Sequence, residues 1–248
     1  MANFNTSNRG FLYGDGFFET MRIDNNDIPL WSLHIERAKR AGDFLEFTWP
    51  DTSTVESLKA EILQNQPDGS DIVRLDFFRE GGGTYIPNSS EVGMVYSYRS
   101  LPDKPSAFVV DLNQIEPAIA SLQPISIGFY KELTKSSNAL STFKTTSALL
   151  LVKAGLYLKN QPGIDDIILF NDKGLICEAL SSNILIKKAG KWYGVSAEHG
   201  PVQGVYQGYI TKTLGVEFTS ITLEDVVQAD KIILTNAATG ITAAQLIG

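Results

Sequence analysis

The segment "DDIILFNDKGLICEALSSNILI", residues 165–186, contains three short apolar runs and places one acid in the middle run. Each run is long enough for a strand, and "NDKG" between the first two is typical of a hairpin turn. Glu178 has only uncharged neighbours from Leu175 to Leu180. Because desolvation of an unpaired carboxylate is costly, burial of Glu178 would require a positive partner.

Two interpretations of Glu178 are open from these residues alone. In a strand it shares a face with Ile176 and Leu180, whereas Cys177 points to the other face. If the strand lies at a sheet edge, Glu178 is an acid that faces water. If the strand is covered, Glu178 is a buried carboxylate that holds a proton on a heteroaromatic nitrogen.

The composition limits the classes of function. The chain has 248 residues, 43% of them hydrophobic and 20% charged, with a net charge of −7, which is typical of a globular protein and unlike a nucleic-acid-binding surface. One cysteine and two histidines leave no thiolate metal cage and no His-rich metal site. We expect no membrane segment and no signal peptide, and therefore a cytoplasmic protein. If the chain is an enzyme, lysine, carboxylates or a cofactor must carry the reaction.

Strand and helix patterns on both sides of this segment predict an α+β protein of two domains. Residues 1–110 form a small N-terminal α/β domain, residues 111–123 a linker, and residues 124–248 a larger, β-rich domain. In the first half we expect a strand pair from "FFETMRI" and "IPLW", helices over 32–47 and 51–66, and strands in 70–83 and 92–102. In the second we expect a strand at 125–130, a helix starting just after Lys144, a four-stranded meander over 165–196, a helix at 205–215 and a strand at 231–237.

Lys144 and Arg37 are the cationic candidates. Lys144 is either a solvated lysine near a helix N-terminus or, if it is buried there, an amine with a lowered pKa that can attack a carbonyl. Arg37 is either part of a solvated basic face or a clamp for an anion. Gly204–Ile210 places a glycine before a helix start, and Thr235–Gly240 is a turn of small polar residues, so both could bind a phosphate.

Taken in order, these segments resemble the class IV aminotransferase family, the fold-type IV enzymes that use pyridoxal phosphate. The resemblance begins with "YGDGFFETMRI" and continues through "LHIERAKRAG" and "FKTTSALL". It ends with "DDIILFNDKGLICEALSSNILI", "GVYQ" and "LTNAATGIT". It therefore implies a two-domain fold similar to D-amino acid aminotransferase.

The resemblance also implies a cofactor site for pyridoxal 5'-phosphate. Lys144 would form the covalent aldimine and then act as the general base, while Glu178 would face the ring nitrogen. The implied cofactor-binding residues are Arg37, Lys144, Glu178, Ser181, Val205, Tyr206, Asn236 and Ala237. The implied substrate-binding residues, in the first domain, are Tyr13, Phe18, Thr20, Arg22, Arg74 and Arg79, with Tyr85 near the glycine run.

Several positions depart from the family pattern. Tyr206 and Gln207 replace its usual Thr/Met-Arg, which removes an arginine but leaves main-chain phosphate contacts. Ala237 stands where several relatives have a hydroxyl. Leu149 replaces a tyrosine that branched-chain enzymes place near the cofactor, which counts against that subfamily.

The branch that the sequence resembles most is aminodeoxychorismate lyase, which converts 4-amino-4-deoxychorismate to 4-aminobenzoate and pyruvate. A branched-chain or D-amino acid aminotransferase is the alternative, and a non-catalytic relative is the third hypothesis. The expected partners are a small-molecule amino substrate and a second copy of the chain in a homodimer, with no nucleic acid and no membrane.

Overall fold

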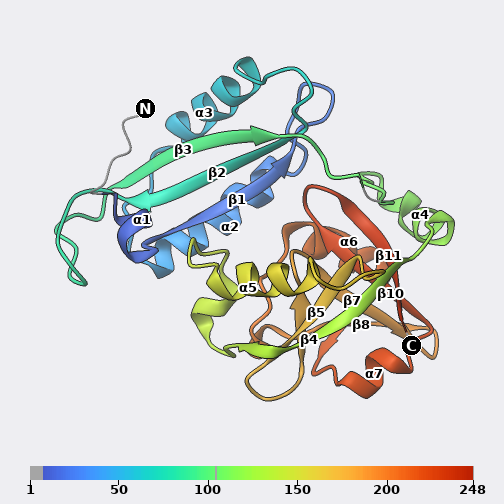
Figure 1. Ribbon diagram of the computed structural model, residues 1–248. Coiled ribbons are helices and arrows are strands. Elements are labelled where there is room, and N and C mark those ends of the chain that lie inside the picture. The colour runs from blue at the N-terminus through green and yellow to red at the C-terminus, as the bar shows by residue number, and fades with distance from the viewer. Residues whose placement is uncertain (1–7, 104, 248) are drawn as a thin grey trace. The chain divides into compact units, whose positions relative to one another are not determined.

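The computed structural model describes residues 8–103 and 105–247 (Figure 1). Residues 1–7, at the start of the predicted N-terminal domain, lie outside the described residues. The chain forms two compact units: unit 1 is Met1–Leu101 with Lys144–Ser147, and unit 2 is Pro102–Phe143 with Ala148–Gly248. No described helix is long and apolar enough to cross a membrane.

Unit 1 is a three-stranded antiparallel sheet with helices packed against it. The sheet order is β1-β2-β3, and Figure 1 shows α2 and α3 beside these strands. Its elements are α1 (Arg9–Tyr13), β1 (Gly16–Arg22), α2 (Trp31–Phe44), α3 (Thr52–Gln64), β2 (Ile72–Arg79) and β3 (Val92–Arg99). The two long helices and the strands β2 and β3 confirm the predictions for residues 32–102, except that both strand predictions ran a few residues too far.

Local chemistry explains why α3 begins where it does. Asp51 precedes the helix, and its carboxylate accepts a hydrogen bond from the Thr54 main-chain N–H at 2.8 Å. This satisfies one of the N–H groups that the first turn leaves without an intrahelical partner. The buried side chains Val55 and Ile62 lie on one face, seven residues or about two turns apart.

The predicted return strand at "IPLW" is wrong. Residues 24–27 form a tight turn with a single bridge between Asp24 and Asp27. Leu30 then adopts a left-handed conformation with φ of 62°, and α2 begins at Trp31. A left-handed residue interrupts the extended backbone that a strand needs, so Ile28 and Trp31 are buried outside the sheet.

Unit 2 contains one eight-stranded sheet in the order β6-β5-β4-β11-β10-β7-β8-β9. Its strands are β4 (Ile125–Lys135), β5 (Asp166–Asn171), β6 (Ile176–Ala179), β7 (Asn183–Lys188), β8 (Lys191–Val195), β9 (Glu217–Thr219), β10 (Lys231–Asn236) and β11 (Gly240–Leu246). Its helices are η1 (Leu112–Gln114), α4 (Ile115–Ser121), η2 (Ala139–Thr142), α5 (Leu149–Leu158), η3 (Ala197–His199), α6 (Val205–Leu214) and α7 (Leu223–Val227).

The strand order corrects the predicted four-stranded meander. β5 pairs with β6, and β7 pairs with β8, but β7 also pairs with β10, and four strands separate β6 from β7 in the order. In a flat sheet those two strands would lie about 24 Å apart. The connection from Ala179 to Asn183 spans at most about 14 Å, so the sheet must curl.

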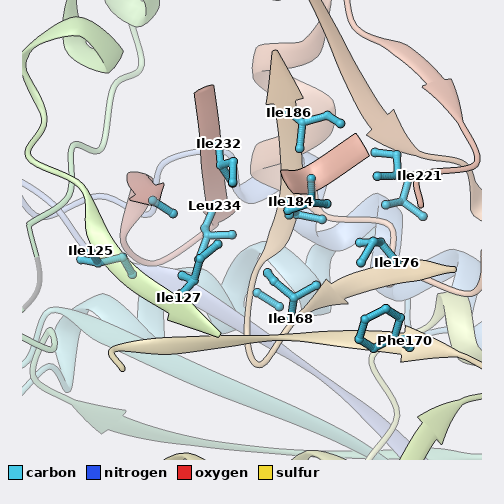
Figure 2. Packing of buried hydrophobic residues seen from close by; sticks show 14 residues of the cluster. Ile125, Ile127, Ile168, Phe170, Ile176, Ile184, Ile186, Ile221, Ile232 and Leu234 are labelled. Atoms are coloured by element: carbon cyan, nitrogen blue, oxygen red, sulfur yellow. The ribbon is translucent and has the colours of Figure 1, made fainter. Parts of the chain in front are cut away.

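The curled sheet of unit 2 encloses an apolar core. Figure 2 shows this cluster, to which Ile168 of β5, Ile176 of β6, Ile184 of β7 and Leu234 of β10 all contribute fully buried side chains. Each fully buried side chain of this size stabilises the fold by about 1.5–3 kcal/mol relative to an exposed one. On the sheet's other side α5 packs against β4 and β5.

Two further expectations differ from the structure. Residues 111–123, predicted as a linker, contain η1 and α4 of unit 2, in which Ile115 and Ile119 are buried. The helix expected just after Lys144 begins at Leu149 instead. The helix starts late because the residues after Lys144 first pair with β1: Phe17 bridges Thr145, and the Thr146 N–H donates to Gly16 O at 3.0 Å.

Candidate active site

Glu178 is buried in unit 2, with 5% of its surface exposed, which excludes the interpretation of an edge-strand acid facing water. All four residues of β6 are buried, although β6 ends the strand order. One carboxylate oxygen of Glu178, Oε1, accepts a hydrogen bond from Lys135 Nζ. The other, Oε2, accepts from the Val202 main-chain N–H at 2.9 Å. The buried acid therefore has both a cation and a fixed dipole as partners.

Val202 connects Glu178 to the start of α6. The Val202 carbonyl accepts from Asn183 Nδ2 at 2.7 Å, and Asn183 lies against Gly204, the N-cap of α6. A Cβ on Gly204 would lie 1.9 Å from Asn183 Oδ1, so any larger residue there would require Asn183 to shift. Val202 and Val205 are three residues apart, at most about 11 Å along an extended chain. The carboxylate and the helix N-terminus are therefore neighbours.

The N-terminus of α6 has a glycine N-cap and no side-chain hydrogen bond to that cap. Gly204 provides no side chain to cap the first turn of this ten-residue helix. Main-chain N–H groups at such a terminus, with the helix dipole, favour a phosphate. The Tyr206 side chain has another task, since its hydroxyl donates to Val109 O at 3.0 Å and accepts from Val109 N at 2.9 Å. Tyr206 replaces another residue of the family pattern, and its hydroxyl is used in the contact with Val109. The predicted phosphate contacts at this helix are therefore main-chain N–H groups.

The turn between β10 and β11 is tied to the turn after β6. Asn236 Nδ2 donates to Ser181 O at 2.5 Å, and Asn236 Oδ1 accepts from the Ala238 N–H at 2.8 Å. Ala237 lies between these residues and is partly exposed. Thr235 Oγ1 is buried and has no hydrogen-bond partner among the described residues. Unit 2 thus connects Ser181 directly with the Asn236–Ala237 turn.

In unit 1, Lys144 is held beside β1. The Phe18 N–H donates to Lys144 O at 2.9 Å, and Lys144 Nζ lies 4.5 Å from the centre of the Phe18 ring. Arg74 Cζ lies 3.5 Å from the same ring centre. Both cations therefore contact one aromatic ring. Each cation–π contact stabilises the fold by about 0.5–2 kcal/mol, depending on how exposed it is.

Four of the predicted substrate residues share one face of the sheet of unit 1. Phe18, Thr20 and Arg22 alternate along β1, and Arg74 of β2 is the cross-strand partner of Thr20. Arg74 also pairs with Asp76, at 2.6 Å between Nη2 and Oδ1. The face combines an aromatic ring, a hydroxyl and two guanidinium groups, which is chemistry suited to a carboxylate-bearing molecule.

The opposite face of β1 carries a buried charge network. Glu19 accepts from Arg37 Nε at 2.8 Å and from Arg37 Nη2 at 2.5 Å, and His34 Nδ1 lies 2.6 Å from Glu19 Oε2. Burial opposes the ionisation of Glu19, but the Arg37 and His34 contacts outweigh it and lower its pKa to about 2. Arg37 is itself buried, so it does not belong to a solvated basic face. Its part in holding a phosphate stays a prediction.

The remaining two predicted substrate residues have structural contacts in unit 1. Arg79 is buried and donates to Asp15, to Glu46 O at 3.2 Å and to Leu45 O at 2.5 Å. Tyr13 packs edge-on against Tyr85 with ring centres 5.8 Å apart. These contacts shape the glycine loop and its surroundings, and a part in binding substrate stays a prediction for both residues.

An open groove of about 650 Å³ lies elsewhere in unit 1, along α3 and β3. Its lining includes Ser57, Glu61, Glu80 and Tyr96 and none of the predicted site residues. Hydrogen bonds between Tyr96, Glu61 and Asn65 already occupy part of its polar lining.

The sequence interpretation missed Lys135 and Glu19. Lys135 is 43 residues from Glu178, and only the pairing of β4, β5 and β6 brings them together. Glu19 sits in an alternating strand, where its position among Phe17, Phe18 and Met21 was a usable signal. Like Glu178, it is an acid with apolar neighbours and therefore required a buried cation.

Comparison with known proteins assigns the chain to a family. The family model for amino-transferase class IV matches residues 16–247. An aminodeoxychorismate lyase of Bacillus subtilis is 29% identical over 246 residues, which cover 92% of this chain and 76% of that protein. A putative branched-chain-amino-acid aminotransferase of Methanocaldococcus jannaschii is 24% identical, covering 96% and 80% of the two chains.

Solved structures share the fold. The crystal structure of 4-amino-4-deoxychorismate lyase from Pseudomonas aeruginosa matches with a TM-score of 0.83 at 20% identity, covering 99% of this chain and 88% of that one. The branched-chain amino acid aminotransferase of Escherichia coli matches with a TM-score of 0.79 at 16% identity, covering 99% and 81%. Both the α+β prediction and the resemblance to fold-type IV enzymes are confirmed. The chain belongs to the class IV aminotransferase family of enzymes.

Proposed function

We propose that this protein is a pyridoxal-phosphate-dependent lyase that converts 4-amino-4-deoxychorismate to 4-aminobenzoate and pyruvate. The proposal rests on one observation: Glu178 is hydrogen-bonded to Val202, three residues before the start of α6. A buried carboxylate and a helix N-terminus, connected through Val202, match the two ends of a molecule with a basic ring nitrogen and a phosphate. The 29% identity with an aminodeoxychorismate lyase supports the choice of reaction.

The donor and acceptor groups of the chain fit this cofactor. A carboxylate has about four acceptor sites, and Lys135 and Val202 use two of those of Glu178. That leaves capacity for a protonated ring nitrogen. For the phosphate we propose, within unit 2, the main-chain N–H groups of Val205 and Tyr206 and the turn at Asn236–Ala237, with Ser181 supporting that turn.

When bound, pyridoxal phosphate supplies an electron-accepting ring that stabilises negative charge on the substrate. Lys144 Nζ would hold the cofactor covalently between turnovers and take the proton from the substrate ring carbon. The backbone pairing of Lys144 with β1 fixes the main-chain position from which its side chain extends. Glu178 would hold the proton on the ring nitrogen.

The substrate would bind on the face of β1 and β2 that carries Phe18, Thr20, Arg22 and Arg74. Guanidinium groups bind carboxylates through paired, charge-assisted hydrogen bonds, and the substrate carries carboxylates. The Phe18 ring packs against the guanidinium group of Arg74. Tyr13 and Arg79 would act through the shape of the neighbouring loop.

Transamination of branched-chain or D-amino acids is the second candidate. It is favoured by similarity to a putative branched-chain-amino-acid aminotransferase over 96% of the chain. Leu149, at the position of a tyrosine in branched-chain enzymes, is 79% exposed in this structure and provides no ring hydroxyl. This difference favours the lyase.

The two reactions differ in their need for an amino acceptor. Purified protein supplied with pyridoxal phosphate should release pyruvate and 4-aminobenzoate from 4-amino-4-deoxychorismate with no 2-oxo acid present. Formation of glutamate from leucine or a D-amino acid and 2-oxoglutarate, without pyruvate release, would establish the aminotransferase instead. A protein that stays colourless with excess pyridoxal phosphate would refute both.

We also propose that the enzyme is a cytoplasmic homodimer, as the family resemblance implies. Light scattering coupled to gel filtration measures the mass in solution directly. A dimer should show twice the chain mass of 27.2 kDa. A single chain mass at micromolar concentration would contradict this proposal and leave the reaction to be decided by the assays above.

A further inference from the structure

Lys135 is the cation that meets Glu178. Its Nζ donates to Glu178 Oε1, and the side chains are 14% and 6% exposed, respectively. Such a pair is desolvated on both sides, so its geometry is held far more firmly than that of a surface ion pair.

The strand arrangement of unit 2 creates this contact. Lys135 is the last residue of β4 and pairs with Asn171 at the end of β5, while Glu178 on β6 pairs with Leu169 of β5. Register shifts occur in both pairings, between Tyr130 and Lys135 and between Leu169 and Phe170. Such irregularities redirect side chains, and here the lysine of β4 reaches across β5 to the acid of β6.

We propose that Lys135 is a positioning residue that fixes the Glu178 carboxylate through a charge-assisted hydrogen bond, so that the carboxylate is oriented to accept a hydrogen bond from the ring nitrogen of a bound cofactor. This rests on the proposed function, in which Glu178 faces that nitrogen. With Lys135 on one oxygen and the Val202 N–H on the other, the carboxylate cannot rotate without losing a hydrogen bond. It is oriented before any ligand arrives.

The physical reason concerns the direction of one hydrogen bond. A carboxylate accepts a hydrogen bond from a protonated ring nitrogen only when its oxygen is correctly oriented, and Lys135 and the Val202 N–H hold the two oxygens of Glu178 in place. Without the charge-assisted hydrogen bond from Lys135 the carboxylate can turn away, and the ring nitrogen loses the acceptor that favours its protonated form.

The test uses pyridoxal phosphate labelled with ¹⁵N at the ring nitrogen, whose chemical shift reports the protonation of that atom in the loaded protein. Wild type should give the signal of a protonated ring. Lys135→Met should move it toward the unprotonated position, and Lys135→Arg should restore it. Lys131→Met, which removes an exposed lysine from the same strand, should leave it unchanged.

A second measurement examines the pair in cofactor-free protein through urea unfolding. Lys135→Met leaves a buried acid unpaired and should lower the folding equilibrium constant by about 10²- to 10³-fold. Adding Glu178→Gln to that variant should recover most of the loss, because the double variant has no buried charge at this position. Losses that simply add in the double variant would overturn the pairing.

The outcomes separate this inference from the proposed function. A ¹⁵N signal unchanged in Lys135→Met but moved in Glu178→Gln overturns the role of Lys135 alone. A signal unchanged in both variants overturns the placement of Glu178 at the ring nitrogen and the inference with it. If Lys135→Met is too unstable to load, the shift in Lys135→Gln, which keeps a hydrogen-bond donor but no charge, decides in the same way.

Discussion

The main-chain N–H of Phe18 donates to the carbonyl of Lys144 at 2.9 Å, joining residues 126 positions apart. This hydrogen bond is one of a series along β1, since Thr146 bonds to Gly16 O through its N–H at 3.0 Å and to Gly14 O through its hydroxyl at 2.9 Å. These main-chain hydrogen bonds therefore fix the backbone of Lys144 beside β1.

Replacement of Lys144 should abolish function with only a modest effect on stability. In Lys144→Ala the backbone pairing remains but the contact with the Phe18 ring is lost, so we expect the unfolding free energy to fall by about 0.5–2 kcal/mol. Turnover should fall by at least about 10²-fold, and the visible absorbance of the loaded protein should disappear. Absorbance spectra and borohydride reduction followed by peptide mass spectrometry check this. Lys153→Ala, at an exposed position on α5, serves as the control and should behave like wild type.

Gly204→Ala and Gly208→Ala should have different effects, although both lie at α6. A Cβ at Gly204 would overlap Asn183 Oδ1, which must move and pull the first turn of the helix with it. We expect the dissociation constant for pyridoxal phosphate to rise by about 10- to 100-fold as a charged hydrogen bond is lost.

At Gly208 a Cβ has no neighbour within 4 Å. Alanine there should stabilise the helix by about 0.5–1 kcal/mol and leave cofactor affinity unchanged. Fluorescence titration and urea unfolding of the two variants provide the comparison. Equal affinities in Gly204→Ala and wild type would show that the start of α6 does not hold the phosphate.

The burial of His34 should make stability depend on pH. Burial lowers the pKa of His34 below its ordinary value of 6.5, and its Nε2 is buried with no partner among the described residues. The unfolded chain therefore binds a proton near pH 6.5 that the folded chain does not. Stability should be fully present above pH 6.5 and fall as the pH drops below it, by up to about 1.4 kcal/mol per pH unit.

Urea unfolding of wild type and His34→Asn between pH 7.5 and 5 tests this. Asparagine retains a donor toward Glu19 but does not titrate, so the slope should be smaller in the variant. Glu19 contributes at lower pH, because its folded pKa of about 2 lies below the ordinary 4.5. Its stabilisation is present above pH 4.5 and lost as the pH falls toward 2. Equal slopes in the two proteins from pH 6.5 to 5 would contradict the role of His34.

The thiol of Cys177 should react only when unit 2 unfolds. It is the only cysteine in the chain, is fully buried, and bonds through Sγ to His199 O at 3.4 Å. Burial, followed by the nearby charge of Glu178, raises its pKa to about 12 from the ordinary 9.0. At pH 8 this leaves about 10³-fold less thiolate than in the unfolded chain.

Labelling with a chromogenic disulfide reagent at increasing urea concentrations should follow the unfolding transition seen by circular dichroism. A native-state reaction at the rate of the unfolded chain would show that the core around β6 opens readily. Ile176→Ala, which creates a cavity in the same core, should shift both transitions together by about 2–5 kcal/mol.

Local patterns were sufficient for most elements. α3 is specified by the cap at Asp51 and the apolar spacing of Val55 and Ile62, all within thirteen residues. The strand β1 follows from the alternation in "GFFETMR". The prediction at 28–31 failed because an apolar tetrapeptide fits a strand or a buried turn equally well, and only the left-handed Leu30 distinguishes them.

The sequence by itself determined the class of fold and the family, because these depend on patterns and motifs within short segments. Tertiary structure alone decided that Glu178 is buried and meets Lys135, that Arg37 meets Glu19, and that Lys144 is fixed by β1. Each of these depends on which strands and helices pack against one another and, between strands, on the register. Residues that are far apart in the chain come into contact only when the domain folds. Local sequence preferences therefore cannot predict which of them become partners.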